Sequence, residues 1–142
     1  MTIDWRVVVR AALTGLSIIV PVVIITEILD AQIDDFADSR WLFFPFALIL
    51  FAYAAAGYAG GKLGRLAPYT HGILASLTAL GTWLLIRGGE RLVRGKEFGF
   101  GPRDILTNAM FAAGFGLFGA AIASRAPTAI PADRDQSPDE PA

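Results

Sequence analysis

The chain has 142 residues, of which 54% are hydrophobic and 18% are charged, and its mean hydropathy is +0.53. The formal net charge of −1 is too small to indicate nucleic acid or another polyanion as a partner. The lack of cysteine excludes disulfide bonds, thiolate metal sites and cysteine nucleophiles. Because charged residues crowd the gaps between long apolar stretches, we predict a chain divided between lipid and water.

Four apolar stretches of near-spanning length follow one another along the chain. Crossing the hydrocarbon core takes about 20 residues of helix. The stretches cover about residues 7–29, 41–61, 66–86 and 105–124. Backbone polar groups in lipid must be satisfied within their own segment, so each stretch is predicted to be a helix. The predicted fold is all-α, with residues 1–125 forming an antiparallel bundle of four transmembrane helices.

The first span begins with features of a signal peptide. Arg6 and Arg10 resemble a basic leader, but the apolar stretch is too long for one, and no clean Ala-x-Ala site follows. We therefore interpret it as a retained helix. Pro21 lacks a backbone N–H donor and is expected to kink this helix in its middle.

The segments between and after the spans differ in composition. Residues 30–40 are acidic, and residues 62–65 form a short basic turn. Residues 87–104 form a longer basic loop, in which glycines argue against a helix. We expect its charges to anchor the flanking helices, with binding to anionic headgroups as the alternative. Residues 126–142 are rich in Pro, Ala and acidic residues and are predicted to be disordered.

The count of positive residues does not decide the orientation, because the two sides carry equal numbers. With the N-terminus inside, the cytoplasmic side would carry Arg6, Arg10, Lys62, Arg65, Arg125 and Arg134. The opposite side would carry Arg40, Arg87, Arg91, Arg94, Lys96 and Arg103. Since the first helix often dominates and its leading flank is basic, we predict an inner (plasma) membrane protein with both termini in the cytoplasm.

Small residues recur at every fourth position on the second and fourth predicted helices, which places them on one helix face. On the second helix they are Ala52, Ala56, Gly60 and Gly64, with Gly57 and Gly61 beside them. On the fourth helix they are Ala112, Gly116, Ala120 and Ser124. We expect these ladders to pack within the bundle, with a dimer interface as the alternative. Their sixty-residue offset also fits a tandem duplication of one helical hairpin.

Few ionisable or polar groups fall within the predicted spans. Glu27 lies about 30 Å along the helix from Val7, near the far membrane interface. His71, the only histidine, is expected to be interfacial or to hydrogen-bond between helices, with a proton relay as the less favoured role. Asn108 is expected to hydrogen-bond between helices.

The sequence carries no enzyme, metal or cofactor signature. The spans hold too few histidine and carboxylate groups for a metal site. Ser17 and Ser76 lack an evident base partner, and the GxSxG elbow is missing. The Gly-Gly-Lys run at residues 60–62 fails the Walker spacing. We therefore expect a protein that is not an enzyme and needs no cofactor.

The central run AYAAAGYAGGKLGRLAPYTHGILASLTALGTWLLI combines a glycine-rich helix end, a short basic turn and a glycine early in the next helix. Together with AAGFGLFGAAIAS, it resembles uncharacterised four-pass bacterial membrane proteins of the YrzE type over about residues 7–124. The acidic first loop, the more basic third loop and the tail depart from that pattern. The resemblance implies the architecture and transfers no functional residues.

Two function hypotheses follow from these observations. The small-residue faces favour a non-enzymatic membrane component or accessory subunit. Its partners would be the lipid bilayer and either other membrane proteins or a second copy of the chain, with no nucleic acid. The alternative is a small dimeric exporter with Glu27 and His71 as transport residues. Against the exporter, Glu27 lies near a helix end, and no aromatic cage surrounds a midplane charge.

Overall fold

The computed structural model describes residues 3–35, 39–95 and 100–126, which form four long helices and one short 3-10 helix. These elements are α1 (Trp5–Gln32), η2 (Arg40–Leu42), α2 (Phe43–Leu63), α3 (Pro68–Val93) and α4 (Pro102–Arg125). With η2 counted as part of α2, each long helix is long and apolar enough to cross a membrane. The predicted all-α fold with four membrane-spanning helices is confirmed. The predicted disordered tail lies outside the described residues from residue 127 onward.

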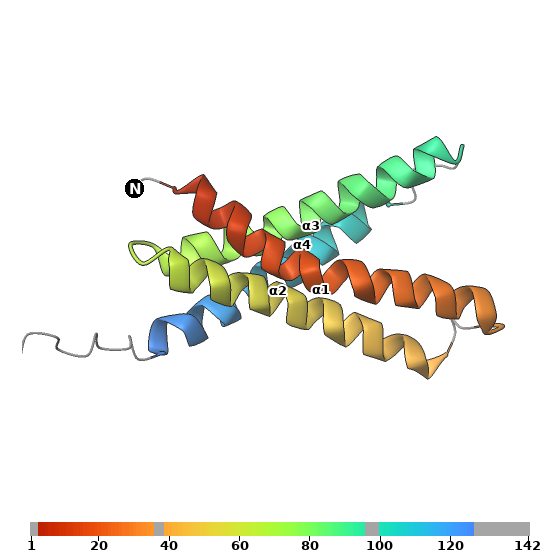
Figure 1. Ribbon diagram of the computed structural model, residues 1–142, viewed down its shortest axis with the longest axis horizontal. Coiled ribbons are helices and arrows are strands. Elements are labelled where there is room, and N and C mark those ends of the chain that lie inside the picture. The colour runs from red at the N-terminus through yellow and green to blue at the C-terminus, as the bar shows by residue number, and fades with distance from the viewer. Residues whose placement is uncertain (1–2, 36–38, 96–99, 127–142) are drawn as a thin grey trace, which may run out of the picture.

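The helix starts use local signals that stabilise a first turn. The side chain of Asp4 caps α1 by accepting a hydrogen bond from the N–H of Arg6 at 3.0 Å. Pro68 and Pro102 are the first residues of α3 and α4, where a missing N–H costs nothing. Pro21 lies inside α1, which changes direction near its middle (Figure 1).

The main difference from the predicted elements concerns α3, which continues past residue 87 into the expected loop. Gly88 and Gly89 both lie within the helix. The carboxylate of Glu90 lies 3.3 Å from the guanidinium of Arg87 and 2.7 Å from that of Arg94. The expectation that glycines end the helix is wrong. Ion pairs between residues three and four positions apart, together with contacts with α1, offset the cost of about 1 kcal/mol for each glycine in the helix.

The helices form two hairpins, α1 with α2 and α3 with α4, which cross one another (Figure 1). The central helices α2 and α3 each contact the other three long helices. Among the described residues, no Cα atom of α1 lies within 8 Å of one in α4. A duplicated hairpin would relate α1 to α3 and α2 to α4, so the contact between α2 and α3 has no counterpart between α4 and α1. The start of α1 and the end of α4 lie at the same end of the molecule (Figure 1).

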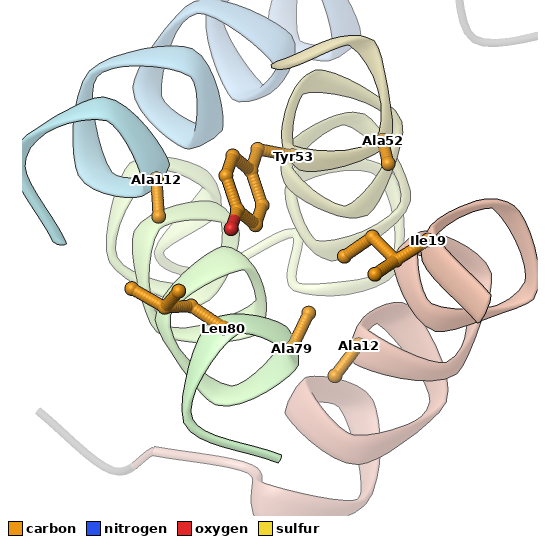
Figure 2. Packing of buried hydrophobic residues seen from close by; sticks show 7 residues of the cluster. All are labelled: Ala12, Ile19, Ala52, Tyr53, Ala79, Leu80 and Ala112. Carbon is orange, nitrogen blue, oxygen red and sulfur yellow. The ribbon is translucent and has the colours of Figure 1, made fainter. Parts of the chain in front are cut away.

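Alanine is the most frequent residue in the core. Its buried cluster consists of Ala12, Ile19, Ala52, Tyr53, Ala79, Leu80 and Ala112. Figure 2 shows Tyr53 extending from α2 towards Leu80 and Ala112. Large apolar side chains instead face outward, as at Leu85 and Met110, which are 73% and 69% exposed. This arrangement suits a lipid environment, where close van der Waals packing replaces the hydrophobic drive between helices.

Candidate functional site

The backbones of α2 and α4 touch where glycines face each other. A Cβ atom added to Gly57 would lie 2.6 Å from the Cα atom of Gly116. One added to Gly61 would lie 2.9 Å from the Cα atom of Ala120. Gly119 meets the α2 backbone in the same way. Since real Cβ contacts are longer than this, only hydrogen fits at these positions, and the small residues set the distance between the helices.

The other small residues of α2 face different neighbours. Ala52 and Ala56 are buried against α1, where a Cβ atom added to Gly15 would lie 3.0 Å from the Cβ atom of Ala56. Gly60 faces α3, and a Cβ atom there would lie 2.7 Å from the carbonyl oxygen of His71. The second helix therefore presents small residues to all three of the long helices around it.

The ladder on α4 is likewise covered by helices of the same chain. Ala112 and Ala120 are fully buried, and a Cβ atom on Gly72 of α3 would lie 2.6 Å from the Cβ atom of Ala120. Ser124, at the end of the ladder, lies 3.3 Å from the hydroxyl of Tyr69. The faces that the sequence offers for either packing or dimerisation are thus occupied by intramolecular contacts.

His71 is 3% exposed and joins the start of α1 to α3. Its Nδ1 atom lies 2.9 Å from the carbonyl oxygen of Ala67, to which it donates. Its Nε2 atom accepts the N–H of Asp4 at 3.1 Å. Gly64 lies against the ring, because a Cβ atom there would be 2.7 Å from Nδ1. Of the roles considered for this histidine, the geometry is that of a hydrogen-bonding group between helices.

Two further polar side chains make hydrogen bonds that the sequence pattern did not reveal. Ser76 of α3 donates to the carbonyl oxygen of Tyr53 on α2 at 2.8 Å. Asn108 donates to the carbonyl oxygen of Asp104, in its own helix, at 2.9 Å. The expectation of an interhelical bond for Asn108 is wrong, since its short side chain is satisfied four residues back.

Glu27 of α1 forms an ion pair with Arg87 of α3. The Arg87 guanidinium also lies 6.0 Å from the centre of the Trp83 ring. The side chains of Glu27 and Arg87 are 40% and 28% exposed. Sequence reasoning placed Glu27 correctly near the helix end but assigned Arg87 to a loop, so it missed the pair. The signal in the sequence that could have revealed the pair was the presence of opposite charges near the ends of two spans on the same side of the membrane.

The ion pair lines a cavity of about 470 Å³ between α1, α2 and α3, which we call the ion-pair pocket. Three aromatic side chains, Phe43, Phe46 and Trp83, share its walls with aliphatic residues. The charged groups therefore lie at one part of an otherwise apolar cavity. The structure brings aromatic rings to Glu27, although at the end of the helix and not at a midplane charge.

A second cavity, of about 610 Å³, lies on the outer face of α2 between α1 and α4, and we call it the outer groove. Ala54, Ala55 and Ala59 of α2 contribute to it, with Thr14 from α1 and Phe118 from α4. The groove exists because α1 and α4 flank α2 without contacting each other. It combines a floor of small residues with a bulkier rim.

Within residues 3–35, 39–95 and 100–126, no group of three or more histidine, aspartate or glutamate side chains is arranged to bind a metal ion. Comparison of the chain with known protein families, characterised proteins and solved structures finds no match. The resemblance to membrane proteins of the YrzE type therefore stays a prediction.

Proposed function

We propose that this chain is a non-enzymatic component of the inner membrane, an accessory subunit that binds one transmembrane helix of a larger protein. The observation that carries the proposal is the outer groove over Ala54, Ala55 and Ala59. Small residues let a helix backbone approach closely, and van der Waals contact drives association in lipid. A helix seated between α1 and α4 would gain contacts on three sides.

The end of the outer groove also favours a particular kind of partner. Lys62 lines the groove at the end of α2, with its ammonium 5.8 Å from the centre of the Tyr58 ring. A lysine at this position places a positive charge at the membrane boundary, where long cationic side chains extend to water. A partner helix with an acidic residue at that boundary matches this charge.

The test is purification of the tagged chain in mild detergent, with size and co-purifying proteins measured together. We expect a larger membrane protein at stoichiometric amount. Ala55→Trp fills the groove and should release that partner. Leu85→Trp, at an α3 position that is 73% exposed, adds similar bulk elsewhere and should retain it. A wild-type chain that elutes without a partner, or an Ala55→Trp chain that keeps one, contradicts the proposal.

The exporter is a second candidate because Glu27 lines a cavity with aromatic walls. Its pairing with Arg87 opposes this function, since a lone cation at Glu27 would have to displace the Arg87 guanidinium. We therefore expect Glu27→Gln to leave the flux of a cationic dye from loaded vesicles unchanged. Abolished flux would make the exporter the better assignment.

We also propose the predicted orientation, with both chain termini in the cytoplasm. The chain has no cysteine, so single cysteines introduced at exposed positions report sidedness without background. Cysteine at Arg6 or Arg125 should resist a membrane-impermeant thiol reagent in intact cells, and cysteine at Arg94 should react. The reverse pattern would place the termini outside.

A further inference from the structure

The ion-pair pocket lies at the level where lipid headgroups begin. Glu27 follows Trp5 by about 33 Å of helix, and Arg87 follows Pro68 by about 28 Å. The hydrocarbon core is about 30 Å thick, so both charges reach its far edge. Trp41, which is 58% exposed at the start of η2, is an aromatic side chain of the kind found at this boundary.

The apolar part of the pocket extends from this boundary into the hydrocarbon. Val23 lies one turn deeper than Glu27 on α1, and Trp83 lies one turn deeper than Arg87 on α3. Phe46 and Ile49 lie progressively further along α2 from its start at the same boundary. The pocket is therefore amphipathic along the membrane normal, with its charged groups at the membrane surface and its apolar lining deeper in the hydrocarbon.

The charges in the ion-pair pocket and directly beside it balance. Glu27 pairs with Arg87, Arg87 also contacts Glu90, and Glu90 pairs with Arg94, which gives two carboxylates and two guanidinium groups. An anionic or a cationic ligand would leave one of these charges in excess. A zwitterion brings one partner for each sign. The contacts of Arg87 with both carboxylates use Nη1, so these contacts leave its Nε and Nη2 donors to a phosphate.

We propose that the ion-pair pocket binds a zwitterionic phospholipid with a primary amine, phosphatidylethanolamine. Its phosphate would accept hydrogen bonds from Arg87, and its ammonium would donate to Glu27. One acyl chain would lie along Val23, Phe46 and Ile49. A quaternary ammonium is less suitable, because it has no N–H to donate and the Trp83 ring is already near the Arg87 guanidinium.

The test uses Trp83 as a fluorescent probe of the pocket. The chain has three tryptophans, and replacing two of them, Trp5→Phe and Trp41→Phe, leaves Trp83 as the single fluorophore. Both replaced side chains are exposed. This protein is placed in vesicles with increasing fractions of brominated phosphatidylethanolamine or brominated phosphatidylcholine. We expect half-maximal quenching by the ethanolamine lipid at about tenfold lower mole fraction, as charge-assisted hydrogen bonds imply.

Matched variants show which side chains cause the preference for the ethanolamine lipid. Glu27→Gln with Arg87→Gln removes both charges of the pocket, and it should abolish the tenfold difference. Arg94→Gln changes the same charge cluster outside the pocket lining and should retain it. Equal quenching by the two lipids in the parent protein overturns the proposal whether or not the variants fold. Stronger quenching by anionic phosphatidylglycerol overturns it too.

Discussion

The glycine contacts and the ion-pair pocket show two ways in which helices of one bundle meet. At Gly57 and Gly116, helix backbones touch, and a single added carbon atom has no room. Around Glu27 and Arg87, the helices stand apart and leave a cavity of about 470 Å³. Small facing residues bring the helix backbones into contact, and larger facing residues leave an open cavity.

The largest loss of stability is expected where the α2 and α4 backbones touch, which we call the closed region. Gly57→Ala places a Cβ atom 2.6 Å from the Cα atom of Gly116, and two backbones cannot yield as a flexible side chain can. We expect a loss of about 3 kcal/mol in the free energy of unfolding, at the upper end of overpacking costs. Unfolding by sodium dodecyl sulfate in mixed micelles, followed by circular dichroism, measures this loss.

Gly81→Ala is the matched control on α3. A Cβ atom at Gly81 meets no other atom within 4 Å. This variant should be neutral, or more stable by up to about 1 kcal/mol because alanine favours a helix. Equal destabilisation by the two substitutions would show that helix contact distance is not what the glycines provide.

Ser76→Ala tests whether polar bonds add to the packing of the closed region. It removes the hydrogen bond to the carbonyl oxygen of Tyr53 and leaves the small volume of the side chain nearly unchanged. The expected loss is about 1 kcal/mol, in the range of hydrogen bonds between membrane helices. The same detergent titration reports it. A loss as large as that of Gly57→Ala would mean that this one hydroxyl contributes as much to the stability of the bundle as the contact between the α2 and α4 backbones.

The smallest effect is expected at the open region. The Glu27–Arg87 pair is partly exposed, so Glu27→Gln and Arg87→Gln together should change stability by about 0.5 kcal/mol. Arg87→Gln leaves Glu27 without its partner and should cost about 1 kcal/mol, whereas Glu27→Gln leaves Arg87 paired with Glu90 and should cost less. A double-mutant cycle under the same conditions separates these terms. A large loss in the double variant would make the pair structural and weaken its assignment to ligand binding.

Local sequence pattern accounted well for the helices and poorly for their partners. Long apolar stretches favour helices in lipid, because a helix satisfies its backbone hydrogen bonds within the one segment. The small residues at every fourth position indicated close contact, but not that α2 would turn Gly57 towards α4 and Gly60 towards α3. Arg87 was missed because its helix was predicted to end too early, before contacts with Glu90 and Glu27 were visible.

The sequence by itself determined that the chain has four membrane-spanning helices with small-residue faces and polar connections. These properties follow from composition and spacing within one segment at a time. Tertiary structure alone decided that the hairpins cross, that α1 and α4 stay apart, and that Glu27 meets Arg87 beside a cavity. Contacts between segments depend on which helix faces turn towards each other, and the side chains of all four helices determine this jointly.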